Sequence, residues 1–434
     1  MQVSFSDNKS NNLLTVLAAF ICVFYPLCDF GATYMMGWAF LLGCWLFVAV
    51  SKRGRLYFTR YRLGYAWIVF IVLIYFVMPN ARNGVKTTQA LIVNMLICVL
   101  YIMSAQIDRN EILRVMKIFI ITGLVLSVYI IVCKLFPNFY LNIMIPRQKG
   151  VDVEMVTHLF NTGYGASISN SITYGSYIIS MASFFCLGDL LCGTKLLSRR
   201  KMIIYELVFL VAVLCEGRRS ELLSLVLSVL IVYFVSTANE AGKVLKRIVI
   251  LMPVLLVVGI IVVVLIRHGY LERFVNTSTL LQKGLTNDNL NNLTSSRVYL
   301  WTGAWNLFKS SPVFGIGWSS FSEYIVTSVD NVHNCYLQFL CETGIVGFIA
   351  IVLPIFFVLA GSISCLKLLL KSIEEQESFS RNAIIVSVGM QLFFLMLLAM
   401  DPVFYKSYYH MMYIILILLY EYSAKLMRES VEAR

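Results

Sequence analysis

Long apolar runs alternate with short polar connections along most of the chain. An apolar run of roughly 20 residues, rising ~1.5 Å per residue in a helix, crosses the ~30 Å hydrocarbon core of a bilayer. Runs that approach or reach this length lie at residues 13–29, 34–50, 64–78, 88–104, 115–135, 166–188, 202–216, 220–236, 248–266, 336–360, 382–400 and 405–421. The short runs at 64–78 and 202–216 need flanking residues to complete a span. The pattern predicts an all-α polytopic membrane protein with about 12 transmembrane helices.

One polar segment, residues 267–335, interrupts this alternation. It begins with the Asn-rich stretch "TNDNLNNLTSS", which has no periodicity and predicts a surface loop. The predicted organisation is therefore transmembrane helices 1–9 at residues 1–266, a large extracytoplasmic loop between spans 9 and 10 at 267–335, and helices 10–12 with a cytoplasmic tail at 336–434.

The second half of this loop carries two further patterns. In "SRVYLWTGAWNLFK", apolar residues at helical spacing predict a short amphipathic helix whose aromatic face lies in the outer interface of the membrane. These residues are Val298, Trp301, Trp305 and Phe308. The next stretch, "SSPVFGIGWSSF", contains Pro312, Gly315 and Gly317, which predict a tight turn that folds the chain back toward the membrane.

The composition and charge agree with this picture. A chain of 434 residues that is 59% hydrophobic and 13% charged cannot bury its apolar surface in a soluble core. More than half of the 35 Lys and Arg residues lie in connections on one side, including "SKRGRLYFTRYR" and "SRRK". The positive-inside rule therefore predicts cytoplasmic N- and C-termini and an outward-facing loop. The net charge of +12 fits this bias and attraction to anionic lipid headgroups, and nothing favours nucleic-acid binding.

Motifs for several kinds of chemistry are missing from the sequence. Most of the 11 cysteines stand singly within apolar runs and give no disulfide framework. There is no Walker loop, GxGxxG, HExxH, or acidic pair with the spacing of metal ligands. We therefore expect neither a cofactor nor a metal.

Two adjacent arginines lie in "CEGRRSELL", a short turn between two predicted spans on the outer side. Translocating positive charge is disfavoured, and a hairpin this short could use Gly, Ser or Asn instead. Arg218 and Arg219 therefore favour an anion-binding role. The alternative is that they snorkel and pair with Glu216 and Glu221.

A second polar group opens the tenth predicted span, "VHNCYLQFLCETGIVGF". His333 and Asn334 stand at its mouth, and Glu342 follows nine residues after His333, about 13 Å along a helix. That separation favours a buried hydrogen-bonding role for Glu342. Arg297 stands at the start of the predicted amphipathic helix.

The stretches "GRRSELL", "SSRVYLWTGAWNLFKSSPVFGIGWSSF" and "HNCYLQFLCETGIVGF", in this order on the outer side, resemble the O-antigen ligase and Wzy-type polysaccharide polymerase superfamily. The resemblance covers residues 210–360 best, and its strength lies in the ordered combination. The usual Ser-Arg pair is replaced by Arg218 and Arg219, so Arg219 aligns with the family arginine. In the first half, "IPRQKG" with Arg147 is only reminiscent of a family Arg-Gly segment.

This resemblance implies a helical bundle similar to the C-type glycosyltransferases, in the bacterial inner membrane with its active site facing outward. The implied partners are an undecaprenyl-diphosphate-linked oligosaccharide donor, a glycan acceptor, membrane lipids, a flippase and a chain-length regulator, without nucleic acid. Family breadth alone favours a polymerase over a ligase that uses lipid A core or a protein. A transporter or flippase is a third possibility, which the scarcity of charge within the spans disfavours.

The resemblance also implies roles for the residues. Arg219 and Arg297 would stabilise charge on the leaving diphosphate, for which guanidinium forks are suited. His333 would take the proton from the acceptor hydroxyl in a metal-independent, inverting transfer, because nearby arginines and a helix N-terminus favour a neutral imidazole. Alternatively, His333 donates a hydrogen bond to the diphosphate, and Glu216, Glu323 or Asp330 is the base. The predicted substrate-binding residues are Arg218, Arg147, Glu342 and Asn334.

Overall fold

The computed structural model of the chain describes residues 13–24, 26, 109–148, 152–168, 173–194, 197–237, 259–260, 263–264, 266–268, 297–325, 331–369, 377–401 and 407–432. Within these ranges all regular secondary structure is helical, as the apolar runs predict. The predicted spans at 34–50, 64–78, 88–104 and most of 248–266 lie outside the described residues.

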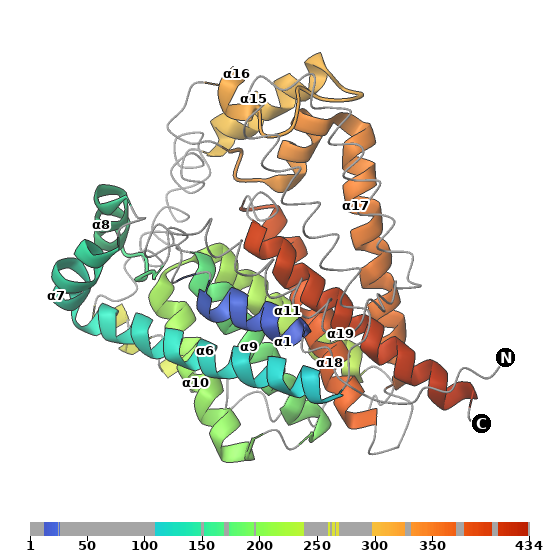
Figure 1. The fold of residues 1–434 in the computed structure, drawn as a ribbon. Helices are drawn as coiled ribbons and strands as arrows, with labels where there is room; N and C mark the ends of the chain where they lie inside the picture. The colour runs from blue at the N-terminus through green and yellow to red at the C-terminus, as the bar shows by residue number, and fades with distance from the viewer. Residues whose placement is uncertain are drawn as a thin grey trace, which may run out of the picture.

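The helices of the main bundle follow the predicted runs (Figure 1). They are α1 (Leu13–Ala19) with its continuation η1 (Phe20–Phe24), α6 (Arg109–Leu135), α9 (Thr173–Cys192), α10 (Arg199–Glu216), α11 (Arg219–Thr237), α17 (Cys335–Leu369), α18 (Glu377–Leu398) and α19 (Ser407–Glu432). Helices α9, α18 and α19 meet at a cluster of aromatic rings, in which the centroid of the Tyr177 ring lies 5.3 Å from that of Phe394 and 4.3 Å from that of Tyr409. These rings belong to the main apolar core.

Four helices of the described part are long and apolar enough to cross a membrane: Arg109–Leu135, Tyr174–Cys192, Cys335–Leu369 and Phe379–Leu398. Large apolar side chains such as Ile121, Phe356 and Phe357 are exposed on these helices. Such exposure is costly in water but matches a lipid environment, where no apolar surface needs to be hidden. The chain is therefore a multi-pass helical membrane protein.

Two expectations for the segment before α9 are wrong. The span predicted to begin at residue 166 begins at Thr173, because residues 164–167 are non-helical and the Gly165 amide donates to the Glu216 carbonyl at 2.9 Å. The segment between α6 and α9 also contains helices, although only a polar connection was predicted. They are α7 (Pro137–Phe139), η3 (Tyr140–Met144), η4 (Ile145–Arg147) and α8 (Val153–Asn161).

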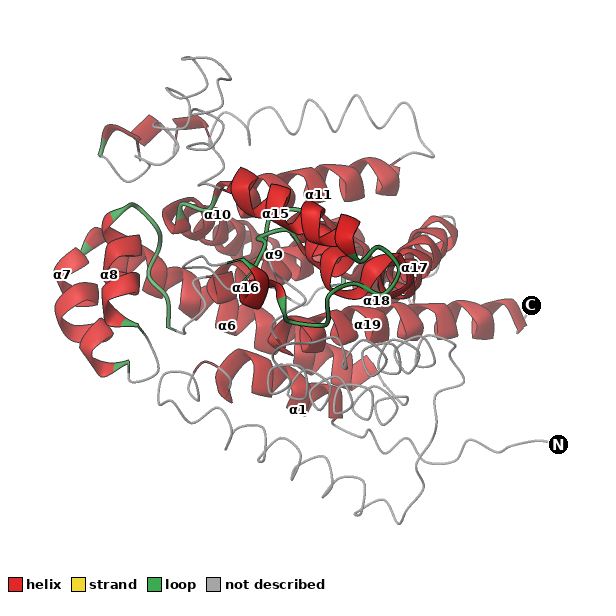
Figure 2. Cartoon of the chain, turned by 90° about the horizontal axis from the view of Figure 1, so that it is seen from above, coloured by secondary structure: helices red, strands yellow, loops and turns green. Residues whose placement is uncertain are grey.

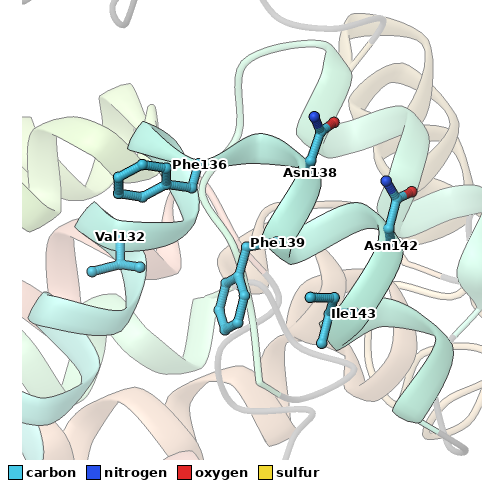
Figure 3. A pocket seen from close by; sticks show the side chains of 6 residues that line it. All are labelled: Val132, Phe136, Asn138, Phe139, Asn142 and Ile143. Carbon is cyan, nitrogen blue, oxygen red and sulfur yellow. The ribbon is translucent and has the colours of Figure 1, made fainter.

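These short helices form a lobe at one side of the molecule, at the C-terminal end of α6 (Figures 1 and 2). Asp152 caps α8 by accepting a hydrogen bond from the Met155 amide at 3.0 Å. A groove of about 500 Å³ lies where α6 meets α7 and η3. Figure 3 shows Asn138 and Asn142 pointing the same way beside its apolar lining.

Residues 297–325 form a second layer over one end of the bundle (Figure 1). It contains α15 (Arg297–Ser310) and α16 (Phe321–Tyr324), and α15 packs on α17. The predicted helix from Val298 to Phe308 is confirmed by α15. Its buried residues are Leu300 and Ala304, whereas Val298 and Trp305 are exposed. Trp301 and Phe308 are partly buried against the cluster of Leu300, Ala304 and Phe321, so only part of the predicted apolar face is exposed.

Candidate active site

The C-terminal end of α18 is the point at which the segments singled out in the sequence meet. Arg218 Nη2 lies 2.9 Å from Asp401 Oδ2, and His333 Nδ1 lies 3.8 Å from Asp401 Oδ1. Arg297 Nη1 donates to the Met400 carbonyl at 2.5 Å, and Cys335 Sγ donates to the Asp401 carbonyl at 3.2 Å. Residues at the starts of α11, α15 and α17 are therefore held at one corner, which we call the Asp401 corner (Met400 and Asp401).

Arg218 is placed by the tight hairpin between α10 and α11. Gly217 caps α10 in the left-handed conformation (φ 67°, ψ 16°), where a side chain would be strained, and α11 begins two residues later at Arg219. Arg218 Nε lies 2.9 Å from Glu221 Oε1, and the Arg218 side chain is only 12% exposed. The alternative considered from the sequence, that these arginines pair with nearby carboxylates, is therefore correct for Arg218 and Glu221. The second carboxylate paired with Arg218 is Asp401.

The Arg218 guanidinium is stabilised in its charged form by neighbouring carboxylates. Burial by itself would lower the pKa of this guanidinium, but Glu221 and Asp401 raise the pKa above its ordinary value. Arg218 therefore stays cationic. Arg219, one residue further on, is partly exposed at the first position of α11.

Arg297 belongs to the same electrostatic environment. Burial lowers the pKa of Arg297, the Asp401 carboxylate opposes this shift, and the neighbouring Arg218 and Arg219 add to it. The guanidinium groups of Arg218, Arg219 and Arg297 therefore lie close enough to repel one another. An added anion would relieve that repulsion.

His333 is fixed by its own backbone at the mouth of α17. It has φ 53°, in the left-handed region that non-glycine residues seldom adopt and that recurs at functional sites. The His333 amide donates to Asn331 Oδ1 at 3.1 Å, and the Asn334 side-chain oxygen caps α17 by accepting from the Leu337 amide at 3.1 Å. Nδ1 of His333 is buried and faces Asp401, whereas the side chain as a whole is 28% exposed. The exposed part of the ring is thus on the other side.

Glu342 holds the glycine-rich turn against α17. Its carboxylate is fully buried and accepts hydrogen bonds from the Ser319 amide at 2.8 Å and the Phe321 amide at 3.1 Å. Gln338 Nε2 donates a third, at 3.2 Å. This is the buried hydrogen-bonding role predicted from the position of Glu342. The turn predicted from Pro312, Gly315 and Gly317 is present and packs directly on α17.

The turn fits into a break in α17. Gly344 (φ 64°, ψ −170°) interrupts the helix, and the Ile345 amide donates to the Pro312 carbonyl at 2.8 Å instead of to its own helix. A Cβ at Gly344 would lie 2.2 Å from the Val313 carbonyl oxygen, and one at Gly315 would lie 2.4 Å from the Glu342 carbonyl oxygen. Both glycines are therefore required by contact between backbones.

Several predicted residues lie elsewhere. Arg147 ends η4 in the lobe of α7 and α8, where its Nη1 donates to the Ile143 carbonyl at 2.5 Å, and Figures 1 and 2 place this lobe apart from α15 and α17. Among the alternative bases, Glu216 is buried at the end of α10, Glu323 is exposed on α16, and Asp330 lies outside the described residues. Within the described part of the chain, His, Cys, Asp and Glu side chains form no group of three that could hold a metal ion.

Asp401 was not among the candidates from the sequence. It follows the apolar run at 382–400 in "AMDPVFYK", so it is a lone carboxylate in a short connection between two predicted spans. The reasoning that drew attention to Arg218, a charge where the chain could have used a neutral residue, applies equally to Asp401.

Residues 204–352 match the family model described as O-Antigen ligase (Wzy_C). No curated protein matches the chain. The matched part runs from α10 into α17 and contains Arg218, Arg219, Arg297 and His333, but it ends before Asp401. The match supports the O-antigen ligase and Wzy-type superfamily on the residues that carried the resemblance.

Proposed function

We propose that the protein is a glycosyltransferase of the inner membrane that transfers a glycan from undecaprenyl diphosphate to a hydroxyl of a lipid-linked acceptor. The observation that carries this proposal is the convergence of Arg218, Arg297 and His333 on the Asp401 corner. The family match over residues 204–352 supports the same class of reaction. Positive-inside orientation would direct this corner to the outer face, where a flipped donor is found.

The donor needs little covalent assistance, because its leaving group is already a diphosphate. The acceptor oxygen attacks the anomeric carbon, the bond from that carbon to the diphosphate oxygen breaks, and the electron pair leaves with the diphosphate. Arg219 and Arg297 stabilise the developing negative charge as guanidinium forks. In-line displacement inverts the anomeric centre.

His333 takes the proton of the acceptor hydroxyl. Its Nδ1 faces Asp401, so Nε2 is the nitrogen available to the substrate, and a carboxylate behind Nδ1 favours the tautomer with a basic Nε2. The present separation of 3.8 Å exceeds a hydrogen bond, and catalytic contacts often shorten when substrate binds. The rival role for His333 is to donate a hydrogen bond to the diphosphate.

The remaining predicted residues have different parts in the proposal. Asn334 uses its side-chain oxygen to cap α17, which leaves its amide group as the substrate contact. Glu342 acts through the turn that it holds. Arg147, in the lobe of α7 and α8, would contact a part of the donor or acceptor distant from the reacting bond. We propose that the transfer uses neither a metal ion nor a cofactor.

We propose a polymerase, with a lipid-linked repeat unit as the acceptor, and with a flippase and a chain-length regulator as partners. The alternative is a ligase that uses lipid A core or a protein. The glycolipid profile of a deletion strain separates the two. Accumulated single-repeat lipid-linked units indicate a polymerase, and full-length unattached chains indicate a ligase. An unchanged profile, with the wild-type gene as the complementation control, would contradict both.

A further inference from the structure

We propose that Arg218 is a positioning residue: it holds the Asp401 carboxylate, and through it the His333 ring, and it does not bind the donor diphosphate. This inference rests on the proposed function and assigns the second arginine of the turn, whose role the sequence left open. It separates Arg218 from Arg219, which aligns with the family arginine.

The first observation is that the Arg218 fork is already occupied. Nε lies 2.9 Å from Glu221 Oε1, and Nη2 lies 2.9 Å from Asp401 Oδ2. The side chain is 12% exposed. A diphosphate could reach Arg218 only through Nη1 alone, or by displacing Nε or Nη2 from a buried carboxylate, which is strongly unfavourable. Arg218 is therefore a poor ligand for an incoming anion.

The second observation is that one of the two carboxylates is itself anchored. Glu221 is buried, and the Ser176 hydroxyl of α9 donates to its Oε2. The chain of contacts runs from α9 through Glu221 on α11 to Arg218, and from Arg218 to Asp401 at the end of α18. Arg218 thus links the contact between α9 and α11 to Asp401.

The third observation is that Asp401 divides its two oxygens. Oδ2 faces Arg218, and Oδ1 faces His333 Nδ1 at 3.8 Å. Because the carboxylate is planar, fixing Oδ2 also fixes Oδ1. Loss of Arg218 would free the carboxylate to turn and would remove the cation that balances it, so the base would lose its orientation while the diphosphate ligands stayed in place.

The test uses the full-length protein in detergent with a defined lipid-linked donor, and measures kcat, donor KM and donor binding. Arg218→Gln should lower kcat by roughly 10- to 100-fold and change donor binding by less than about threefold. Arg218→Lys should recover part of the turnover, because Lys keeps the charge but cannot hold both carboxylates with a planar fork. Arg200→Gln, which removes an exposed arginine at the other end of α10, is the matched control and should resemble wild type.

A double-mutant cycle with Asp401→Asn then tests whether Arg218 acts through Asp401. In the Asp401→Asn background, Arg218→Gln should cost less than about threefold in kcat, because the carboxylate charge that it positions is gone. An equal loss in both backgrounds, together with donor binding weakened tenfold or more, would overturn the proposal and make Arg218 a donor ligand.

Folding is checked by gel filtration and thermal unfolding of each variant. If Arg218→Gln does not fold, Arg218→Lys takes its place in the cycle, with the same expected coupling. Wild-type protein without transfer activity would overturn the proposed function and this role together. Active wild-type protein with no coupling between Arg218 and Asp401 would overturn this role alone.

Discussion

Asp401 faces His333 across the junction of α18 and α17, with its Oδ1 3.8 Å from the buried Nδ1 of the imidazole. The other Asp401 oxygen is paired with Arg218. One carboxylate therefore connects the hairpin between α10 and α11 to the residue proposed as the base. A shift of that hairpin would therefore move the carboxylate that faces the proposed base.

Asp401→Asn preserves the shape of the side chain but removes its charge. We expect turnover to fall by roughly 10²-fold with donor binding nearly kept, because the His333 ring loses the carboxylate behind Nδ1. Turnover and donor binding of the purified variant check this. Glu154→Gln, at an exposed position of α8, controls for loss of a negative charge. Wild-type turnover in folded Asp401→Asn would remove Asp401 from the mechanism.

Gly344→Ala tests the packing of the glycine-rich turn on α17. The added Cβ would lie 2.2 Å from the Val313 carbonyl oxygen, at a backbone with φ 64°. We expect a loss of stability on the order of 2–4 kcal/mol, because both the contact and the conformation are unfavourable. Thermal unfolding in detergent measures it. Gly259→Ala, where a Cβ meets nothing within 4 Å, should leave the midpoint nearly unchanged. Equal effects of the two substitutions would contradict this packing.

The helices of the bundle could be predicted from the sequence because a bilayer demands long apolar runs, and α6, α11 and α18 follow those runs closely. Arg297 and His333 could be identified because each is a polar residue at the start of an apolar or amphipathic helix. The pairing of Arg218 with Asp401 could not be predicted. The two residues are 183 positions apart, and no periodicity reports which helix ends meet in space.

The lobe of α7 and α8 was missed for a different reason. Its helices are short, and α7 is a single turn that begins at a proline, so the segment has neither the length of a span nor a long repeat of apolar residues. The break in α17 at Gly344 was also missed. A glycine within an apolar run is compatible with a continuous helix, and only contact with the turn at Pro312 and Val313 shows why the helix is interrupted.

The orientation of the chain can be measured by chemical labelling. A cysteine placed at Asn291 in a cysteine-depleted background should react with an impermeant maleimide in intact cells or spheroplasts, because residues 267–335 are expected outside. A cysteine at Lys371 should be protected until the membrane is opened. The reverse pattern would place the Asp401 corner on the cytoplasmic side, away from a flipped donor.

Transfer activity in detergent should survive excess EDTA. The expected reason is that guanidinium groups stabilise the diphosphate charge that a divalent cation would otherwise neutralise. The assay compares initial rates with and without EDTA, and then with Mg²⁺ or Mn²⁺ restored. A strict requirement for the added ion would point to a carboxylate site, with Glu323 and Asp330 as the first candidates.

The central claim separates the base from the diphosphate ligands, so it predicts different losses in the two kinds of variant. Arg297→Lys keeps the charge but loses the paired hydrogen bonds, so donor binding and turnover should both be severely impaired, and Ala should be worse. The same loss of donor binding is expected for substitutions of Arg219. Expression and folding of each variant are checked before the comparison.

The most direct measurement is donor binding and turnover of His333→Ala, determined side by side with wild type on the same purified preparation. Turnover should fall by a factor on the order of 10² to 10⁴, the usual contribution of general acid–base catalysis, while donor binding is nearly kept. Wild-type turnover in His333→Ala would contradict the assignment of His333 as the base, and wild-type donor binding in both the Arg219 and Arg297 variants would contradict the diphosphate site.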